Sequence, residues 1–159
     1  MAGPATVVAA TVYDAARWRR LAASGQRLTG VPAGRLPVGR FEVEVAPPAA
    51  LLAHPDLIPD GTLAVVVRED QPGQLTRVSH MGLVVVRDGQ RLVRHASSWP
   101  GFMQVVEEPL ALFLERQGRA SRRPLTGLAL FDLPDNRARL DRLGLPHPPE
   151  GGAIAAPVP

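Results

Sequence analysis

The dipeptide Asp88-Gly89 separates two runs of apolar and β-branched residues, and it restricts the fold more than any other feature of the sequence. Asp-Gly tolerates positive φ at both positions and is the strongest short-range signal for a two-residue hairpin turn. If these residues form the turn, Arg87 pairs with Gln90, and the register of both strands follows from that pair. We therefore expect residues 77–98 to form an antiparallel hairpin.

The expected register brings two of the chain's four histidines to one face of the hairpin. It sets Gly82 opposite His95 and His80 opposite Ser97. Because side chains alternate along a strand, His80 and His95 become diagonal neighbours, about 7–8 Å apart at the backbone. Gly82 has no side chain to crowd the two rings. A turn with a bulge would shift the register by one residue and separate them.

Two histidines on one face are compatible with three roles. They can be a half-buried pair satisfied by hydrogen bonds, a metal-binding pair, or a general base with a partner that fixes its tautomer. The metal role lacks further ligands at suitable spacing, because His54 precedes Pro55 and His147 lies near the C-terminus. The catalytic role requires a nucleophile on another element. We expect no metal and no cofactor.

The rest of the chain predicts an α+β fold, with helices packed on an antiparallel sheet. Apolar runs of strand length indicate strands, and 3.6-residue periodicity indicates helices. The connections are short, and residues 26–40 are rich in Gly and Pro and are expected to be a loop. Strands are expected at 41–45, 61–70, 102–108 and 125–133, and helices at 5–24 and 109–117, with a short helical turn from Pro47-Pro48 through Leu52.

Proline and glycine define the expected ends of the two helices. In the first helix, Val8 and Val12 follow helical spacing, and Gly25 suits the left-handed residue that follows a helix. In the second, Pro109 suits the first helical position and Gly118 is expected to stop the helix.

Composition and charge exclude several classes of function. All 18 basic residues are arginine and the net charge is +3, but the arginines are not interleaved with aromatic residues, so nucleic-acid binding is not expected. No apolar run approaches the roughly 18 residues of a membrane span, and the N-terminus lacks the pattern of a signal peptide. Residues 1–133 are expected to form one domain, and residues 134–159 a flexible tail rich in Pro and Gly.

Four segments of the chain resemble a known family: IPDGTLAVVVRED, VSHMGLVVVRDGQRLVRHASS, VVEEPLALFLER and LTGLALFDL. They resemble the C-terminal half of a bacterial family of N-acetylmuramoyl-L-alanine amidase-like proteins. That family belongs to the NlpC-type, papain-like superfamily of cell-wall cysteine peptidases. The resemblance covers residues 55–133 and is most specific at Ser79-His80-Met81-Gly82 and at Arg94-His95-Ala96-Ser97-Ser98.

The resemblance implies a particular arrangement of catalytic groups. In such a fold, a helix carries a nucleophilic cysteine at its N-terminus and packs against an antiparallel sheet. A general-base histidine lies on one strand, and a polar residue on the next strand orients it. Matched by motif, His80 would be the base and His95 the orienting residue.

The sequence contains no cysteine, whereas the family's cysteine lies in an N-terminal segment. The chain also lacks an export signal, so we expect it to be the back half of a longer protein, without the cysteine-bearing portion. Thr6 and Ser24 are alternative hydroxyl nucleophiles, but nothing around Thr6 resembles the cysteine segment. Ser79, Ser97 and Ser98, beside the histidines, are expected to satisfy backbone groups at the hairpin edges.

Three hypotheses of function follow: an inactive or truncated relative of peptidoglycan amidases and endopeptidases that use Cys–His chemistry, a non-catalytic binding module, or a decayed gene product. The expected partners are a peptidoglycan fragment, a missing N-terminal half, or a second copy bound through an uncovered sheet face. Leu83 and Val85 on one face of the hairpin, and Val84 and Val86 on the other, all require cover. The family implies the cell envelope as its location.

Overall fold

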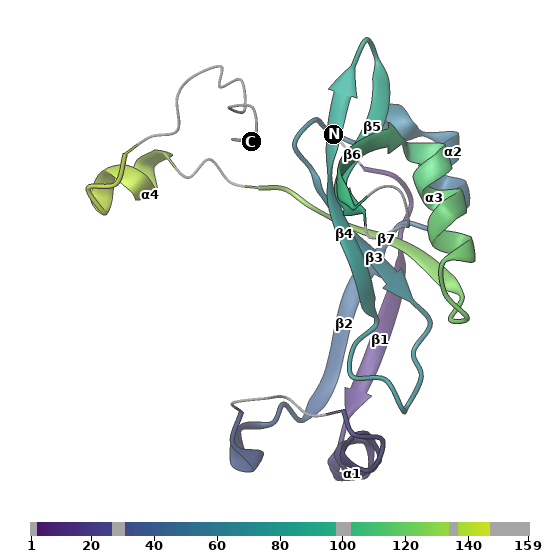
Figure 1. Ribbon diagram of the computed structural model, residues 1–159, viewed down its shortest axis with the longest axis vertical. Helices are drawn as coiled ribbons and strands as arrows, with labels where there is room; N and C mark the ends of the chain where they lie inside the picture. Colours follow the sequence, from purple (N-terminus) through teal and green to yellow (C-terminus); the bar gives the residue numbers. More distant parts are fainter. Residues whose placement is uncertain (1–2, 27–30, 98–102, 134–136, 147–159) are drawn as a thin grey trace.

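The chain forms an α+β fold in which a five-stranded antiparallel sheet adjoins a separate two-stranded ribbon (Figure 1). The computed structural model describes residues 3–26, 31–97, 103–133 and 137–146. Its elements in chain order are β1 (Val7–Tyr13), α1 (Ala15–Ala23), the short 3₁₀ turn η1 (Ala33–Arg35), β2 (Gly39–Val45), α2 (Pro48–Ala53), a second 3₁₀ turn η2 (Pro55–Leu57), β3 (Leu63–Arg68), β4 (Val78–Arg87), β5 (Gln90–Ser97), β6 (Gln104–Pro109), α3 (Leu110–Arg119), β7 (Leu125–Phe131) and α4 (Arg137–Arg142).

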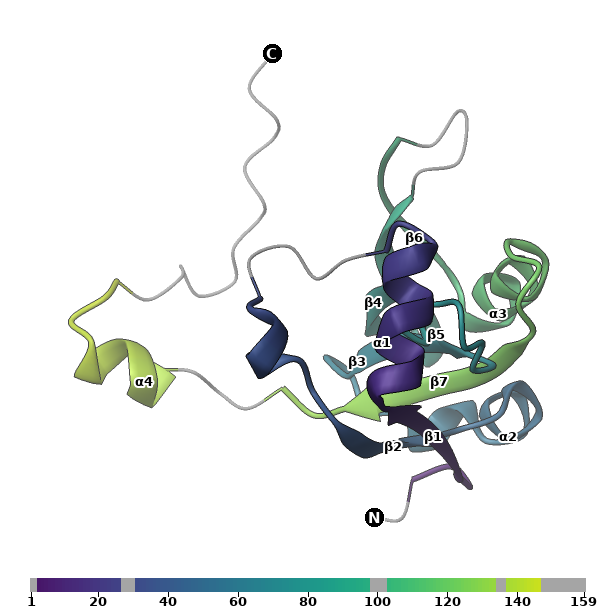
Figure 2. The ribbon, with the colours of Figure 1, turned by 90° about the horizontal axis from the view of Figure 1, so that it is seen from below.

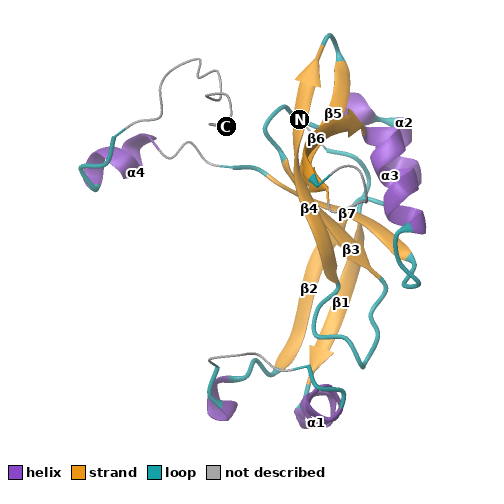
Figure 3. Cartoon of the chain, viewed as in Figure 1, coloured by secondary structure: helices purple, strands orange, loops and turns teal. Residues whose placement is uncertain are grey.

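The strands of the large sheet are ordered β6-β5-β4-β3-β7, so the predicted hairpin β4–β5 lies inside the sheet. Helices α2 and α3 lie together on one face of this sheet (Figure 3). Apolar side chains from that face and from both helices form the main core, because burying them removes the largest apolar surface from water. This core includes Leu51, Ile58, Val66, Val84, Val93, Leu110, Phe113, Leu114 and Leu128.

The hairpin turn has the geometry that the sequence predicts. Asp88 and Gly89 have φ values of 50° and 76°, as a type I′ turn requires. Arg87 pairs with Gln90, and the register continues inward to Val84 opposite Val93. The register of the hairpin is therefore the predicted one, and the side chains that the sequence predicts on one face of it share that face.

The opposite face of the large sheet is covered only in part. The β1–β2 ribbon packs Ala9 and Val45 against Val65, Val67 and Ala129 of β3 and β7. Over β4 and β6, by contrast, Met81 is 55% exposed, Leu83 36% and Val105 65%. Self-association through this part of the face stays a prediction of the sequence.

The predicted helix at 5–24 is wrong in its first half. Residues Val7–Tyr13 form strand β1, which pairs antiparallel with β2 from Val7 opposite Val45 to Tyr13 opposite Gly39. The segment VVAATVY is rich in β-branched residues, which favour a pleated strand over a helix. Asp14 then starts α1, since its side chain accepts a hydrogen bond of 2.6 Å from the backbone N–H of Arg17.

Helix α1 is held by the loop between β3 and β4 rather than by the large sheet. The buried guanidinium of Arg17 donates to both carboxylate oxygens of Asp70, at 2.7 and 2.8 Å, and to the carbonyl oxygen of Gln74 at 2.8 Å. Figure 2 shows α1 in front of the strands, away from α2 and α3. The helix therefore cannot provide the cover for the sheet that a helix at 5–24 would have given.

The remaining elements agree with the sequence except at some ends. The strands expected at 41–45, 61–70, 102–108 and 125–133 correspond to β2, β3, β6 and β7, and the turn after Pro47-Pro48 is α2. Pro109 is the N-cap of α3, and the helix continues through Gly118 to Arg119. Gly118 does not stop the helix, because its backbone stays outside the positive-φ region that ends one.

The region expected to be a tail contains a short helix, α4. The rest of that region, at 134–136 and 147–159, lies outside the described residues. The division into a domain at 1–133 and a flexible tail therefore stays a prediction. Among the described helices, none is long and apolar enough to cross a bilayer.

Replacing Gly82 by alanine should destabilise the fold. A Cβ at this position would lie 2.7 Å from Val93 Cγ1, 2.9 Å from the carbonyl oxygen of Arg94 and 3.0 Å from His95 Cβ. We expect a loss of about 1–3 kcal/mol in the free energy of unfolding, measured by urea denaturation. The matched control is Gly118→Ala, which meets no atom within 4 Å and should stabilise α3 by up to about 1 kcal/mol. Equal stabilities for the two variants would contradict the observed strand contact.

Candidate functional site

Two histidines and a glutamate form a continuous chain of hydrogen bonds on the helix-covered face of the sheet. Nε2 of His80 lies 2.9 Å from Nδ1 of His95. Nε2 of His95 lies 2.9 Å from Oε1 of Glu108, and Oε2 of Glu108 lies 3.2 Å from Nε of Arg116. The two imidazoles that the sequence placed on one face are thus in direct contact.

Three consecutive strands and one helix position these groups. His80 is on β4, His95 on β5 and Glu108 at the end of β6, while Phe113 of α3 packs against both rings, with centroids 6.1 and 5.1 Å away. The contact with Phe113 limits the rotation of both imidazoles. The helix that follows β6 therefore fixes the geometry of the site as well as covering the sheet.

A β-bulge adjusts the end of β4 beside the histidine. Val66 pairs with His80 and Val67 with Val78, so Ser79 is an extra residue on β4. A bulge lets two successive side chains point to nearly the same side of a sheet. Ser79 and His80 accordingly line the same cavity.

The hydrogen bonds define which ring nitrogens carry protons. Glu108 is paired with Arg116, so it is a carboxylate and can only accept the bond from Nε2–H of His95. Neutral His95 then has an unprotonated Nδ1, which accepts from Nε2–H of His80. The 3.4 Å separation between His95 Nδ1 and the Ala96 carbonyl is too long to compete. Neutral His80 is left with an unprotonated Nδ1, which has no partner among the described residues.

The site borders a small cavity of about 220 Å³. Its wall combines His80, His95 and Glu108 with two arginines and several neutral polar groups. Burial is the main cause that lowers the pKa of His80 below its usual value; His95 and Arg68 lower it further, and Glu108 opposes them. His80 is therefore neutral at pH 7 and can accept a proton. The lining residues are Arg68, Ser79, His80, His95, Ser97, Glu108, Arg116, Gln117, Ala120 and Ser121.

The other hydroxyl groups that the sequence singled out lie in different places. Thr6 lines a separate cavity, and the Ser24 hydroxyl donates to the carbonyl oxygen of Leu21 at the end of α1. The hydroxyl of Ser79 accepts a 2.8 Å bond from Nε of Arg68, so its partner is a side chain rather than the expected backbone group. Ser97 is buried beside the histidines, and Ser98 lies outside the described residues.

The geometry does not favour a metal at the histidine pair. Both ring nitrogens of His95 already have hydrogen-bond partners, so a metal could bind only by displacing His80 or Glu108. His54 is at the end of α2, and His147 lies outside the described residues. In the part of the chain that the structure describes, no group of three His, Asp or Glu side chains is arranged to hold a metal ion.

Glu108 is the residue of the site that the sequence reasoning missed. It pairs with Val93, two positions from His95 along β5, which makes Glu108 a diagonal neighbour of that histidine. The segment between β5 and β6, residues 98–103, contains the turn dipeptide Pro100-Gly101 but no two-residue hairpin motif of the Asp-Gly kind. Without such a motif the register of β6 cannot be derived from local sequence, although the strand itself can.

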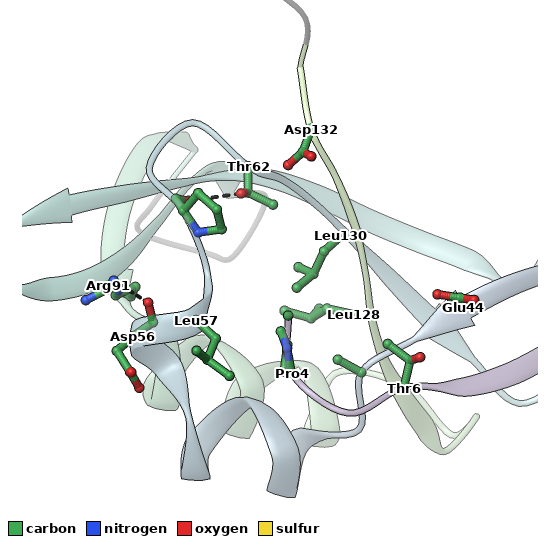
Figure 4. Close-up of a pocket in the computed structure, with 13 residues that line it drawn as sticks. Pro4, Thr6, Glu44, Asp56, Leu57, Thr62, Arg91, Leu128, Leu130 and Asp132 are labelled. Carbon is green, nitrogen blue, oxygen red and sulfur yellow. Dashed lines mark hydrogen bonds between the residues drawn. The ribbon is translucent and has the colours of Figure 1, made fainter. Parts of the chain in front are cut away.

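A larger cavity of about 780 Å³ lies away from the histidines. Figure 4 shows its apolar wall of Leu57, Leu128 and Leu130, with the carboxylates of Glu44 and Asp132 at its margin. None of the histidines that the structure describes borders it. It therefore offers room for a ligand, whereas the smaller cavity is lined by the two histidines and Glu108.

Solved structures share this fold, whereas no protein-family model and no curated protein matches the sequence. A Legionella pneumophila protein of family DUF1460 superposes with a TM-score of 0.57 and 20% identity, over 79% of this chain and 50% of that one. Two structures of an N-acetylmuramoyl-L-alanine amidase from Bacteroides uniformis give TM-scores of 0.54 and 0.53, with 21% and 23% identity. They cover 78% and 80% of this chain. The chain thus has an amidase-like fold and spans about half the length of these neighbours.

The lowered pKa of His80 predicts a loss of stability in mild acid. Its pKa is depressed in the folded state, so below the ordinary histidine pKa of about 6.5 the unfolded chain binds a proton that the folded site does not. We expect the free energy of unfolding to fall as the pH decreases from about 6.5, and this slope to be smaller in His80→Gln. Urea denaturation at several pH values measures both. His54→Gln is the control, and a slope reduced equally in this variant would contradict the assignment to His80.

Proposed function

We propose that this chain provides the proton-transfer half of a peptidoglycan amide hydrolase of the NlpC type. His80 is the general base, His95 orients it, and Glu108 holds His95 in the required tautomer. The observation that carries the proposal is the continuous chain of bonds from Glu108 to His80, which leaves Nδ1 of His80 as a basic nitrogen beside a cavity. The amidase named among the structural neighbours supports the substrate class.

The chemistry requires a nucleophile from outside these 159 residues. A cysteine thiol is the nucleophile that fits, and this sequence contains none. Nδ1 of His80 would accept the thiol proton as sulfur attacks the amide carbonyl carbon, and would return it to the leaving nitrogen as the C–N bond breaks. Water then attacks the thioester carbonyl carbon and gives a proton to His80, which passes it to sulfur as the C–S bond breaks, so the carboxylic acid and the free thiol are released.

The positive charge that forms on His80 is stabilised through the hydrogen-bonded relay of His80, His95 and Glu108. His80 keeps its proton on Nε2 and donates it to His95, while His95 donates to the carboxylate of Glu108. Hydrogen bonds to a charged group are stronger than neutral ones. The relay therefore stabilises the protonated base most during the step in which the nucleophile attacks.

A non-catalytic binding module is the second candidate function. The observation in its favour is the absence of any cysteine from the sequence. The hydroxyl candidates do not replace it, because Thr6 borders the other cavity and Ser24 is the C-cap of α1. In this case the chain would bind a peptidoglycan fragment without cleaving it.

A cysteine placed in the cavity tests whether His80 acts as a base. Ser121 lines the same cavity as His80, so the thiol of Ser121→Cys should be partly ionised near neutral pH. We expect it to react with iodoacetamide at pH 6.5 about tenfold faster than the thiol of Ser24→Cys, the matched control. Adding His80→Gln should remove most of the difference. A rate unaffected by His80→Gln would contradict the role of His80.

Activity on muropeptides distinguishes the two candidate functions. The chain alone should bind muramoyl-L-alanyl peptides without hydrolysing them. It should gain activity when coexpressed with a polypeptide encoded directly upstream that carries a cysteine at a helix N-terminus. His80→Ala should then reduce the rate by at least about a hundredfold. Binding by the chain, with no upstream cysteine-bearing segment and no activity in any combination, would favour the binding module. Chromatography and mass spectrometry of the products measure hydrolysis.

A further inference from the structure

Arg68 is a fully buried cation with no carboxylate partner among the described residues. It is 1% exposed. Its Nε donates to the hydroxyl of Ser79 at 2.8 Å, one terminal nitrogen donates to the carbonyl of Arg123 at 3.0 Å, and the other donates to the carbonyl and side chain of Gln117 at 2.9 and 3.2 Å. All these acceptors are neutral, so the charge of the guanidinium is solvated by dipoles alone.

A structural role explains only part of this arrangement. The carbonyl of Gln117 belongs to the last turn of α3, where the helix dipole provides about half a negative charge. A guanidinium has five N–H groups, and the bonds to Ser79, Gln117 and Arg123 use four. One N–H of Arg68 therefore has no acceptor among the described residues, and its positive charge has no carboxylate partner there.

The residues that line the cavity beside Arg68 suit a bound anion as that partner. Arg68 and Arg116 line it, and of the described residues that line it only Glu108 carries a carboxylate. Because Glu108 already pairs with His95 and Arg116, it does not neutralise Arg68. The hydroxyl-bearing Ser79 and Ser121 complete a wall that offers hydrogen bonds and a net positive charge.

We propose that this cavity is an anion subsite, in which Arg68 recognises a carboxylate carried by the substrate next to the group that His80 serves. The proposal rests on the proposed function for its substrate, since it names the chemical class that the same site would accept. The small volume of about 220 Å³ suits one amino-acid carboxylate rather than a sugar ring or a longer peptide. Arginine suits this task because its planar N–H groups match a carboxylate.

Binding of N-acetylalanine to the isolated chain tests the subsite without any hydrolysis. Its neutral carboxamide, N-acetylalaninamide, is the matched probe that lacks only the charge. In ¹⁵N-labelled protein we expect the carboxylate to shift the signals of the Arg68 Nε–H, both imidazoles of the relay and the Ser121 amide. The carboxamide should bind at least about tenfold more weakly, because a hydrogen bond to a charged group is lost. Equal binding of the two probes would overturn the proposal.

A pair of arginine variants assigns the effect to one residue. Arg68→Gln should weaken carboxylate binding about tenfold or more. Arg91→Gln is the matched control, because Arg91 also donates to backbone carbonyls, those of Asp56, Ile58 and Gly89, but lines the larger cavity. It should leave binding unchanged. Unchanged binding in a folded Arg68→Gln variant would overturn the proposal.

If Arg68→Gln does not fold, the positions of the NMR signals that N-acetylalanine shifts in the unmodified protein test the proposal instead. Shifts centred on the smaller cavity support the subsite, and shifts centred on Arg91 or on the exposed surface overturn it. The result is separable from the proposed hydrolysis. If the chain binds the carboxylate through Arg68 but never gains activity with a thiol, the anion subsite is supported and the proposed hydrolase function is contradicted.

Discussion

The register between β4 and β5 determines where the chemically important side chains of this protein lie. Asp88 and Gly89 adopt the positive φ values that a two-residue turn needs, and the pairing of Val84 with Val93 follows from that turn. A shift of one residue would move His95 to the opposite face of the sheet. The contact between the imidazoles thus depends on a turn located at the far end of the hairpin.

Helix α3 contacts the side chains that this register brings together and restricts their positions. Phe113 packs against both imidazole rings and Arg116 pairs with Glu108. The backbone carbonyl of Gln117 accepts a hydrogen bond from Arg68. The polar groups buried beneath the helix are therefore joined to one another and to the helix itself. A buried polar network restricts its members strongly when its hydrogen bonds are satisfied, because each broken bond leaves a group without water. The same helix covers the main core, so the site and the fold have a common support.

Local sequence predicted the parts of this structure that local interactions determine. The hairpin, its register and the neighbouring histidines follow from a turn and from alternation along strands. Glu108 could not be found in this way, because its position depends on how β6 pairs with β5 across residues 98–103, whose Pro-Gly dipeptide marks a turn but does not fix a register. The helix expected at 5–24 failed for another reason: its apolar residues fit two periodicities, and pairing with β2 decided in favour of the strand. Asp14, read as a helix start, would have indicated the boundary.

His80, His95 and Glu108 come from three strands that follow one another in the chain and lie side by side in the sheet. No distant segment is interposed between them. A gene fusion, a fission or a recombination event outside this interval would therefore transfer the two histidines and the glutamate together as one heritable unit, smaller than the domain that contains it. The ancestry of this interval can be traced separately from that of the segments that flank it in the chain, and the histories need not coincide.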